Sequence, residues 1–355
     1  MDLAKIDKNF EVKTNINKDD IVFYNADELP FRVYGVFKEN GKYRRMPEEV
    51  AKRVNEGVNV LHTHTTGGRV RFVTDSEYVA IYAKISGVEA RAHFAMTGLT
   101  GFDLYVGNAY ENTFIPPFDM SNGFEGIREF GNREMREITI NFPLYSNVEE
   151  LYIGLQEDAE VKEGKPYVNE KPIVYYGSSI TQGGCASRPG MSYQNIVSRV
   201  LNCDFVNLGF SGSARAEDAM IEYIKNLDMS VFVCDYDHNA PSTEHLEKTH
   251  QKMFKTVREA HPHIPVIIMP RPKHRLDEDE EARFAIIKKT YEEAKALGDK
   301  NVYLIDGKML TELCGDEGTV DGIHPTDLGF VSIAKALCNC MESIIEGKDK
   351  THERI

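Results

Sequence analysis

The chain has 355 residues, of which 41% are hydrophobic and 28% charged, a globular composition with enough length for two domains. Its formal net charge of −14 argues against nucleic-acid binding, which is indicated by an excess of positive charge. No stretch reaches the apolar length of a membrane span, and the N-terminal residues lack the apolar core of a signal peptide. We therefore expect a cytoplasmic protein with no nucleic-acid or membrane partner.

Short β-type runs separated by turn residues fill the chain from about residue 20 to 160. Residues 69–85 alternate apolar and polar, break at Asp75-Ser76 and alternate again, as a hairpin does. One helix is expected at 46–57, with proline near its start and Gly57 after its end. Many short strands with glycine, asparagine and proline turns predict a jelly-roll-like β-sandwich over residues 1–165.

Strands alternate with helices after about Val168. Strands are expected at 172–176, 204–208, 230–235, 264–269 and 301–306, and helices at 191–201, 216–227, 243–260, 279–297 and 326–345. Apolar strands with helical crossovers predict a five-stranded parallel sheet covered on both faces, an α/β/α domain over residues 166–355. The polar segment 157–171 between the halves is expected to be a linker.

Residues suited to acyl-transfer chemistry follow the strands of the second half. Gly-Ser-Ser follows the first strand at 177–179, Gly212 the second and Asn239 the third, while Asp321 and His324 precede the last helix. In parallel sheets ligands bind at the carboxyl ends of the strands. Nucleophilic acyl transfer needs a hydroxyl, a base, a group that orients the base, and donors for the oxyanion. One sheet edge is thus expected to carry all of them.

The same residues resemble the four sequence blocks of the SGNH (GDSL-type) hydrolases. The stretch GSSITQG is similar to the first block, G-D-S-I-T-x-G, and matches its nucleophile with Ser179. FSGSA matches the second block with Gly212, and the third-block asparagine matches Asn239. DGIHP is similar to the last block, D-x-x-H-P, through Asp321 and His324. The resemblance covers about residues 170 to 345.

Two departures from the family pattern accompany this resemblance. Ser178 stands where the family has aspartate, a residue outside the triad, so the chemistry is expected to survive. DYDHN, residues 235–239, replaces a glycine-containing run and is expected to narrow the pocket. In the first half, TTGGRVRFVTDS and GFDLY resemble a β-rich domain found ahead of bacterial SGNH esterases.

The resemblance implies a catalytic triad of Ser179, His324 and Asp321. Its oxyanion would be held by the backbone N–H groups of Ser179 and Gly212 and by the amide of Asn239. From the residues alone, Ser179 could instead be a plain turn residue. Asp321 and His324 could instead cap the last helix.

Six further residues are weaker candidates for function. Asp237 and His238 lie beside the oxyanion asparagine and Arg271 follows the fourth strand, so all three could contact substrate. Alternatively, Asp237 and His238 could form hydrogen bonds within the structure, and Arg271 could be exposed to solvent. His62 and His64 would share a face of a strand and could form half of a metal site, with His93 only a guess for a third ligand. We expect no metal, because polar surface or packing accounts for these histidines.

The function expected from the resemblance is hydrolysis of a carboxylic ester, with small acyl groups on carbohydrate as the expected substrates. No cofactor is required. An acyltransferase or a thioesterase would use the same triad. A carbohydrate-binding protein with an inactive hydrolase domain is the contrasting hypothesis, and a homo-oligomer is a weakly supported expectation.

Overall fold

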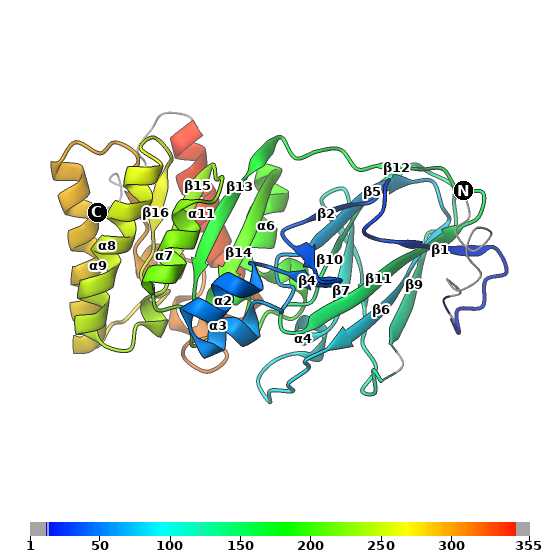
Figure 1. Ribbon diagram of the computed structural model, residues 1–355, viewed down its shortest axis with the longest axis horizontal. Coiled ribbons are helices and arrows are strands. Elements are labelled where there is room, and N and C mark those ends of the chain that lie inside the picture. Colours follow the sequence, from blue (N-terminus) through cyan, green and yellow to red (C-terminus); the bar gives the residue numbers. More distant parts are fainter. Residues whose placement is uncertain (1–11, 13, 122, 346–355) are drawn as a thin grey trace. The chain divides into compact units, whose positions relative to one another are not determined.

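The computed structural model describes residues 12, 14–121 and 123–345, which form two compact units (Figure 1). The first unit contains the chain up to Arg44, Thr63–Pro166 and Arg188–Gly190. The second contains Arg45–His62, Tyr167–Ser187 and the chain from Met191 onward. Two short segments therefore depart from the expected division at 165/166: residues 45–62 belong to the second unit and residues 188–190 to the first.

The first unit consists of two antiparallel sheets that share one apolar core. One sheet has the order β1-β11-β6-β9 and the other β12-β5-β10-β7-β8, with β2 also paired to β5. Alternate residues of facing strands, such as Ile81 of one sheet and Ile140 of the other, meet in this core. The expected β-sandwich is confirmed. Part of the expected linker is strand β12, which pairs with β5.

The strands of the first sheet are β1 (Ile21–Asn25), β6 (Tyr78–Ser86), β9 (Phe124–Glu129) and β11 (Asn147–Gln156). Those of the second are β2 (Arg32–Tyr34), β5 (Arg69–Thr74), β7 (Phe102–Val106), β8 (Ala109–Phe114), β10 (Arg136–Asn141) and β12 (Val161–Glu163). The hairpin of β3 (Phe37–Glu39) and β4 (Lys42–Arg44) and the short helix α4 (Met96–Leu99) complete this unit.

The GFDLY stretch forms β7 and directs a buried carboxylate at another segment of the same unit. Asp103 is fully buried and accepts hydrogen bonds from the Asn141 amide at 2.7 Å and from the Gly190 backbone N–H at 2.7 Å. The guanidinium of Arg188 lies 2.9 Å from the same carboxylate and also donates to the hydroxyl of Tyr105. Asp103 thus anchors residues 188–190, whose neighbours in the chain belong to the second unit.

The second unit is built on a parallel sheet with the order β14-β13-β15-β16-β17 (Figure 1). Its strands are β13 (Asn169–Gly177), β14 (Cys203–Gly209), β15 (Val231–Asp235), β16 (Val266–Ile268) and β17 (Val302–Leu304). The first strand along the chain, β13, lies between β14 and β15, and the strand order reverses around it. Such a switch point is where open α/β sheets bind ligands.

Helices cover both faces of this sheet. Val174 and Tyr176 belong to a core shared with α7, α8 and α9, while Tyr175 faces α6 through Tyr193. Successive strand residues point to opposite faces, so α6 and its neighbour α11 form the opposite layer. The expected α/β/α architecture is confirmed. The helices are α5 (Ser179–Gln182), α6 (Tyr193–Leu201), α7 (Asp218–Lys225), α8 (Thr243–Ala260), α9 (Glu278–Ala296), α10 (Gly307–Leu310) and α11 (Asp327–Ile345).

The helix expected at 46–57 is two helices, α2 (Glu48–Val54) and α3 (Glu56–Leu61). Asn55 separates them and caps α3 by accepting a hydrogen bond from the backbone N–H of Val58. Gly57 therefore lies inside a helix and does not follow one. Apolar residues of both helices enter the core of the second unit, which explains why this segment leaves the sandwich. Among the described residues, no helix is long and apolar enough to cross a membrane.

Candidate active site

A tight turn at the carboxyl end of β13 carries Ser179 as the first residue of α5. The hydroxyl of Ser178 accepts a hydrogen bond from the backbone N–H of Ile180 at 3.2 Å and so caps this helix. Serine and aspartate are both favoured N-cap residues. The departure from the family pattern at position 178 therefore preserves a capping oxygen.

Glycine is required on both sides of this turn because backbones approach closely there. A Cβ on Gly177 would lie 2.1 Å from Oγ1 of Thr181 and 2.2 Å from the carbonyl oxygen of Asp235. A Cβ on Gly209, at the end of β14, would lie 2.2 Å from the backbone nitrogen of Gln182. The two glycines allow α5 to pack directly onto the sheet edge, which fixes the position of Ser179.

Ser179, His324 and Asp321 form a continuous chain of hydrogen bonds. The Oγ atom of Ser179 lies 2.9 Å from Nε2 of His324, and Nδ1 of His324 lies 2.7 Å from Oδ2 of Asp321. The other carboxylate oxygen, Oδ1, accepts the backbone N–H groups of Ile323 at 3.0 Å and His324 at 2.8 Å. A hydroxyl, an imidazole and a carboxylate in this order are the components of nucleophilic acyl transfer.

The carboxylate of Asp321 is held in its charged form. Burial opposes this, but the two backbone N–H groups and the imidazole of His324 outweigh it and lower the pKa of Asp321 to about 2. The alternative that Asp321 caps the last helix does not fit, because the N–H of Gly329 in α11 donates to the hydroxyl of Thr326.

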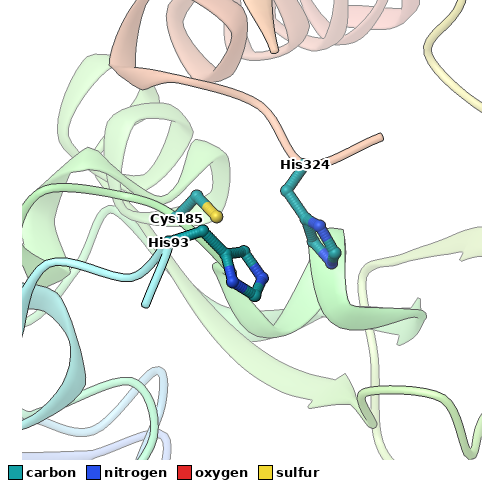
Figure 2. Close-up of side chains that lie close together, drawn as sticks. All are labelled: His93, Cys185 and His324. Carbon is teal, nitrogen blue, oxygen red and sulfur yellow. The ribbon is translucent and has the colours of Figure 1, made fainter. Parts of the chain in front are cut away.

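Cys185 also lies at this site, although its position was not expected from the sequence. Its Sγ atom lies within 4.8 Å of a ring nitrogen of His324 (Figure 2). Burial, together with the nearby charge of Asp321, raises the pKa of the Cys185 thiol to about 12. The thiol therefore stays neutral, and the group hydrogen-bonded to the imidazole at this site is the Ser179 hydroxyl. The pair of glycines before Cys185 was the available sequence signal for a sharp turn here.

Gly212 lies in the loop after β14, and Asn239 lies in the short 3₁₀ helix after β15. Gly212 has φ of +69°, a left-handed conformation that favours glycine, and a Cβ there would enter open space. The side-chain oxygen of Asn239 accepts a hydrogen bond from the backbone N–H of Ala214 at 3.3 Å. Because its oxygen is used in this way, the amide of Asn239 presents its NH₂ group as the remaining donor.

The segment 45–62 supports this loop. Arg45 is 2% exposed, and its guanidinium donates to the carbonyl oxygens of Asn207 at 2.9 Å, Gly209 at 2.7 Å and Leu61 at 2.6 Å. The amide of Asn55 donates to the carbonyl oxygen of Ser213 at 3.0 Å. The sequence pattern predicts that this segment belongs to the sandwich, so neither Arg45 nor Asn55 was expected here.

Replacing Arg45 by methionine should destabilise the protein by about 3 kcal/mol, since buried carbonyl groups left unpaired cost about 1–3 kcal/mol each. Methionine fills similar space but donates no hydrogen bond. Urea unfolding of Arg45→Met and of Arg53→Met, an exposed arginine in the same segment, measures the difference. The control should lie within about 0.5 kcal/mol of the wild type. Equal effects in both variants would mean that the Arg45 hydrogen bonds do not support the loop.

Asp237 and Arg271 bind each other. The Nε atom of Arg271 lies 2.9 Å from Oδ2 of Asp237, and its Nη1 lies 2.9 Å from Oε1 of Glu280. Arg283 adds a further contact to Asp237. Burial opposes ionisation of Asp237, but the charge of Arg271 outweighs it and lowers the pKa of this carboxyl. This ion-pair network shows that Asp237 and Arg271 bind within the structure, which for Asp237 was the alternative to contact with the substrate.

His238 lies half-buried between Asp237 and Asn239 in the short 3₁₀ helix 237–239. Burial and the positive charge of Arg271 lower its pKa to about 4, and His324 contributes in the same direction. His238 is therefore a neutral imidazole near the imidazole of His324. His238 remains a candidate for contact with the substrate.

The histidines considered for a metal site do not share a strand. His62 follows the last turn of α3, and its Nδ1 lies 2.6 Å from the carbonyl oxygen of Asn59. His64 is buried in the first unit, with its ring 5.9 Å from that of Tyr145. The metal-site hypothesis required His62 and His64 to lie on one face of a strand, and they do not. Packing accounts for both histidines.

Comparisons with known proteins agree with this architecture. Residues 170–342 match the GDSL-like Lipase/Acylhydrolase family, and residues 21–161 match the N-terminus of Esterase_SGNH_hydro-type. A search among curated proteins found no match. The chain thus carries a GDSL-like lipase/acylhydrolase domain behind a GxDLY-type N-terminal domain, and the resemblance to SGNH hydrolases is confirmed. Family and fold together define a carboxylic ester hydrolase.

Three solved structures illustrate the range of relatives. A protein described as a GDSL-like lipase from Bacteroides ovatus has 28% identity and a TM-score of 0.80, over 92% of this chain and 98% of that one. A salicylyl-acyltransferase from a tetracycline biosynthetic pathway has 17% identity and a TM-score of 0.75, over 92% and 98%. An acetyl xylan esterase from Butyrivibrio proteoclasticus has 12% identity and a TM-score of 0.58, over 92% and 99%. The last two share the fold.

Proposed function

We propose that this protein is a serine esterase that removes small acyl groups, acetyl first among them, from carbohydrate hydroxyls through an acyl-serine intermediate. The observation that carries the proposal is the hydrogen-bonded chain from Ser179 through His324 to Asp321. It supplies a nucleophile, a base and a charged group that orients the base, all at the switch point of the sheet.

Each residue of this chain has one role in the proposed reaction. Nε2 of His324 accepts the proton of the Ser179 hydroxyl as its oxygen attacks the acyl carbon. His324 then returns that proton to the leaving alcohol, which gives the acyl-serine. In deacylation His324 activates water, and the free acid leaves as Ser179 regains its proton. Asp321 keeps Nδ1 of His324 protonated and stabilises the imidazolium.

The negative oxygen of the tetrahedral intermediate is held by hydrogen-bond donors in this proposal. They are the backbone N–H groups of Ser179 and Gly212 and the side-chain NH₂ of Asn239. Support comes from the open space beside Gly212 and from the hydrogen bond that fixes the oxygen of Asn239. Such donors act mainly on the transition state, where the charge develops.

Replacing Asn239 by alanine should lower kcat about 10²–10³-fold with a much smaller change in KM, the usual loss for one oxyanion donor. The variant should still show a slow reaction that Ser179→Ala lacks. Steady-state kinetics on a soluble acetyl ester measures both. If KM rose while kcat stayed at the wild-type value, Asn239 would be a ground-state binding residue and not an oxyanion donor.

The choice of a small acyl group rests on two observations. The structurally similar acetyl xylan esterase acts, by its description, on acetylated xylan. Asp237 and the half-buried His238 stand where the family has a glycine-containing run, and we infer that their larger side chains leave less room next to Asn239. The salicylyl-acyltransferase neighbour supports a second candidate, in which an alcohol replaces water in deacylation.

The test is the initial rate of hydrolysis of p-nitrophenyl acetate, butyrate and octanoate, with Ser179→Ala as the blank. A fast acetate reaction with a steep loss at longer chains is expected, followed by release of acetate from acetylated oligosaccharides. Added alcohol acceptors should be included, because net acyl transfer would favour the second candidate. Equal rates on all three esters would overturn the small-acyl proposal. No reaction on any of them would favour a binding protein.

A further inference from the structure

A buried polar network lies directly beneath the turn that carries Ser179. Its centre is Thr181, in the same turn of α5, which is fully buried. The carbonyl oxygen of Thr181 accepts the side-chain amides of Gln194 and Asn207, each at 2.7 Å. Its hydroxyl donates to Oδ2 of Asp235 at 2.9 Å and accepts the hydroxyl of Tyr193 at 3.2 Å. The network therefore holds the turn from below.

Asp235 is the ionisable member of this network. It ends β15 and is 3% exposed, and its carbonyl oxygen also accepts the backbone N–H of Ser178 at 3.2 Å. In the described part of the chain, no lysine, arginine or histidine is hydrogen-bonded to its carboxyl group. Its side-chain partners are the neutral hydroxyls of Thr181 and Tyr193.

A carboxyl in these surroundings holds its proton. Burial of the charged form is costly without a cation, and repulsion from the ionised Asp237 adds to that cost. Together they outweigh the Thr181 and Tyr193 hydrogen bonds and raise the pKa of Asp235 to about 8. Asp237, two residues away, is ionised because Arg271 binds it.

The other titratable groups that interact with Asp235 carry no charge. Burial raises the pKa of Tyr193, on α6, far above its ordinary value. Burial likewise raises the pKa of the Cys234 thiol, on the same strand. Asp237 is therefore the charged group that interacts with Asp235. Ionisation of Asp235 would place a second negative charge beside that of Asp237.

We propose that Asp235 is a positioning residue that works as a neutral carboxylic acid, and that its loss of a proton at alkaline pH disrupts the Thr181 network and displaces Ser179 from His324. The proposal rests on the proposed function, since its main readout is ester hydrolysis. Deprotonation releases the proton to solvent and leaves a buried carboxylate. That carboxylate draws the hydroxyls of Thr181 and Tyr193 toward itself, at the expense of the bond between them.

The first test is kcat against pH from 6 to 10 on an acetyl ester, with the Ser179→Ala rate subtracted for spontaneous hydrolysis. The wild type should lose about ten-fold in kcat between pH 7 and 9, since about nine tenths of a group with a pKa near 8 is ionised one unit above it. KM should change less, because the acyl site itself is intact.

Four variants separate the network from a merely structural role. Asp235→Asn cannot ionise, so its kcat should show no fall in this range, whatever its value at neutral pH. Thr181→Val removes the hydroxyl that links Asp235 to the turn and should flatten the fall, while Thr181→Ser should restore it. Asp228→Asn, an exposed carboxylate, should keep the wild-type profile. An unaltered alkaline fall in Asp235→Asn would overturn the proposal.

A stability measurement tests the same ionisation without any activity. The folded protein binds the Asp235 proton up to about pH 8, whereas an unfolded chain releases it near 3.8. The wild type should therefore lose stability relative to Asp235→Asn as pH rises from about 4 to about 8, and the Tm difference should be constant above that. If no ester is hydrolysed but this difference appears, the proposed function fails and the neutral carboxyl stands. A Tm difference that does not depend on pH would overturn the neutral carboxyl.

Discussion

Ser179→Ala should lower kcat for ester hydrolysis about 10⁶-fold, the loss seen when a serine nucleophile is removed from a complete triad. The hydroxyl donates to Nε2 of His324 and contributes nothing to the capping of α5, which depends on Ser178. Folding should therefore be unaffected, and the circular-dichroism spectrum and Tm should match those of the wild type. Because triad residues act as a unit, adding His324→Ala to this variant should cost almost nothing more.

The adjacent serine provides the matched control. Ser178→Ala removes the oxygen that accepts the N–H of Ile180 and should cost about 1 kcal/mol of stability, as the loss of an N-cap does. The nucleophile remains, so most of the activity should remain as well. If Ser178→Ala were as inactive as Ser179→Ala, the loss would come from the collapse of the turn and would say nothing about a nucleophile.

The arrangement of the second unit could be predicted because its sequence signals are local. The strand expected at 204–208 is β14 (Cys203–Gly209), and the helix expected at 279–297 is α9 (Glu278–Ala296). Asp277 starts that helix with a capping box to Glu280, a pattern contained in four consecutive residues. Local signals of this kind need no knowledge of the rest of the fold.

The assignment of residues 45–62 could not be predicted in the same way. Their helical pattern was visible, but the pattern does not tell which core the apolar face enters. Arg45 shows the difficulty, since its partners Asn207 and Gly209 lie more than 160 positions away in the sequence. The position of Gly57 inside α3 was missed because glycine usually ends a helix.

The candidate site was predicted only where a motif carried it. Ser179, Asp321 and His324 were predicted from their positions at the strand ends and before the last helix and from the resemblance, and their hydrogen bonds place them together. Asp235 stands in the sequence beside Asp237, and nothing local distinguishes the two carboxyls. The structure does, because Arg271 reaches Asp237 whereas Asp235 meets neutral hydroxyls. Contacts from distant elements decide which carboxyl is charged.

Asp321→Asn should lower kcat about 10⁴-fold while leaving the loop that holds His324 in place. Oδ1 of Asp321 accepts the backbone N–H groups of Ile323 and His324, and the asparagine oxygen can do the same. The asparagine NH₂ would then face Nδ1 of His324, which must become an acceptor. The remaining ring proton would move to Nε2, the atom that has to accept the proton of Ser179.

Kinetics and structure together test this tautomer argument. Asp321→Asn should keep its Tm within a few degrees of the wild type, whereas Asp321→Ala should also lose the turn and be less stable. Because the pKa of Asp321 is about 2, its carboxylate stays charged above pH 4, so a fall in wild-type activity between pH 4 and 7 cannot come from this residue. A variant Asp321→Asn with more than a tenth of the wild-type kcat would mean that His324 finds its orientation elsewhere, and the proposed triad would reduce to a dyad.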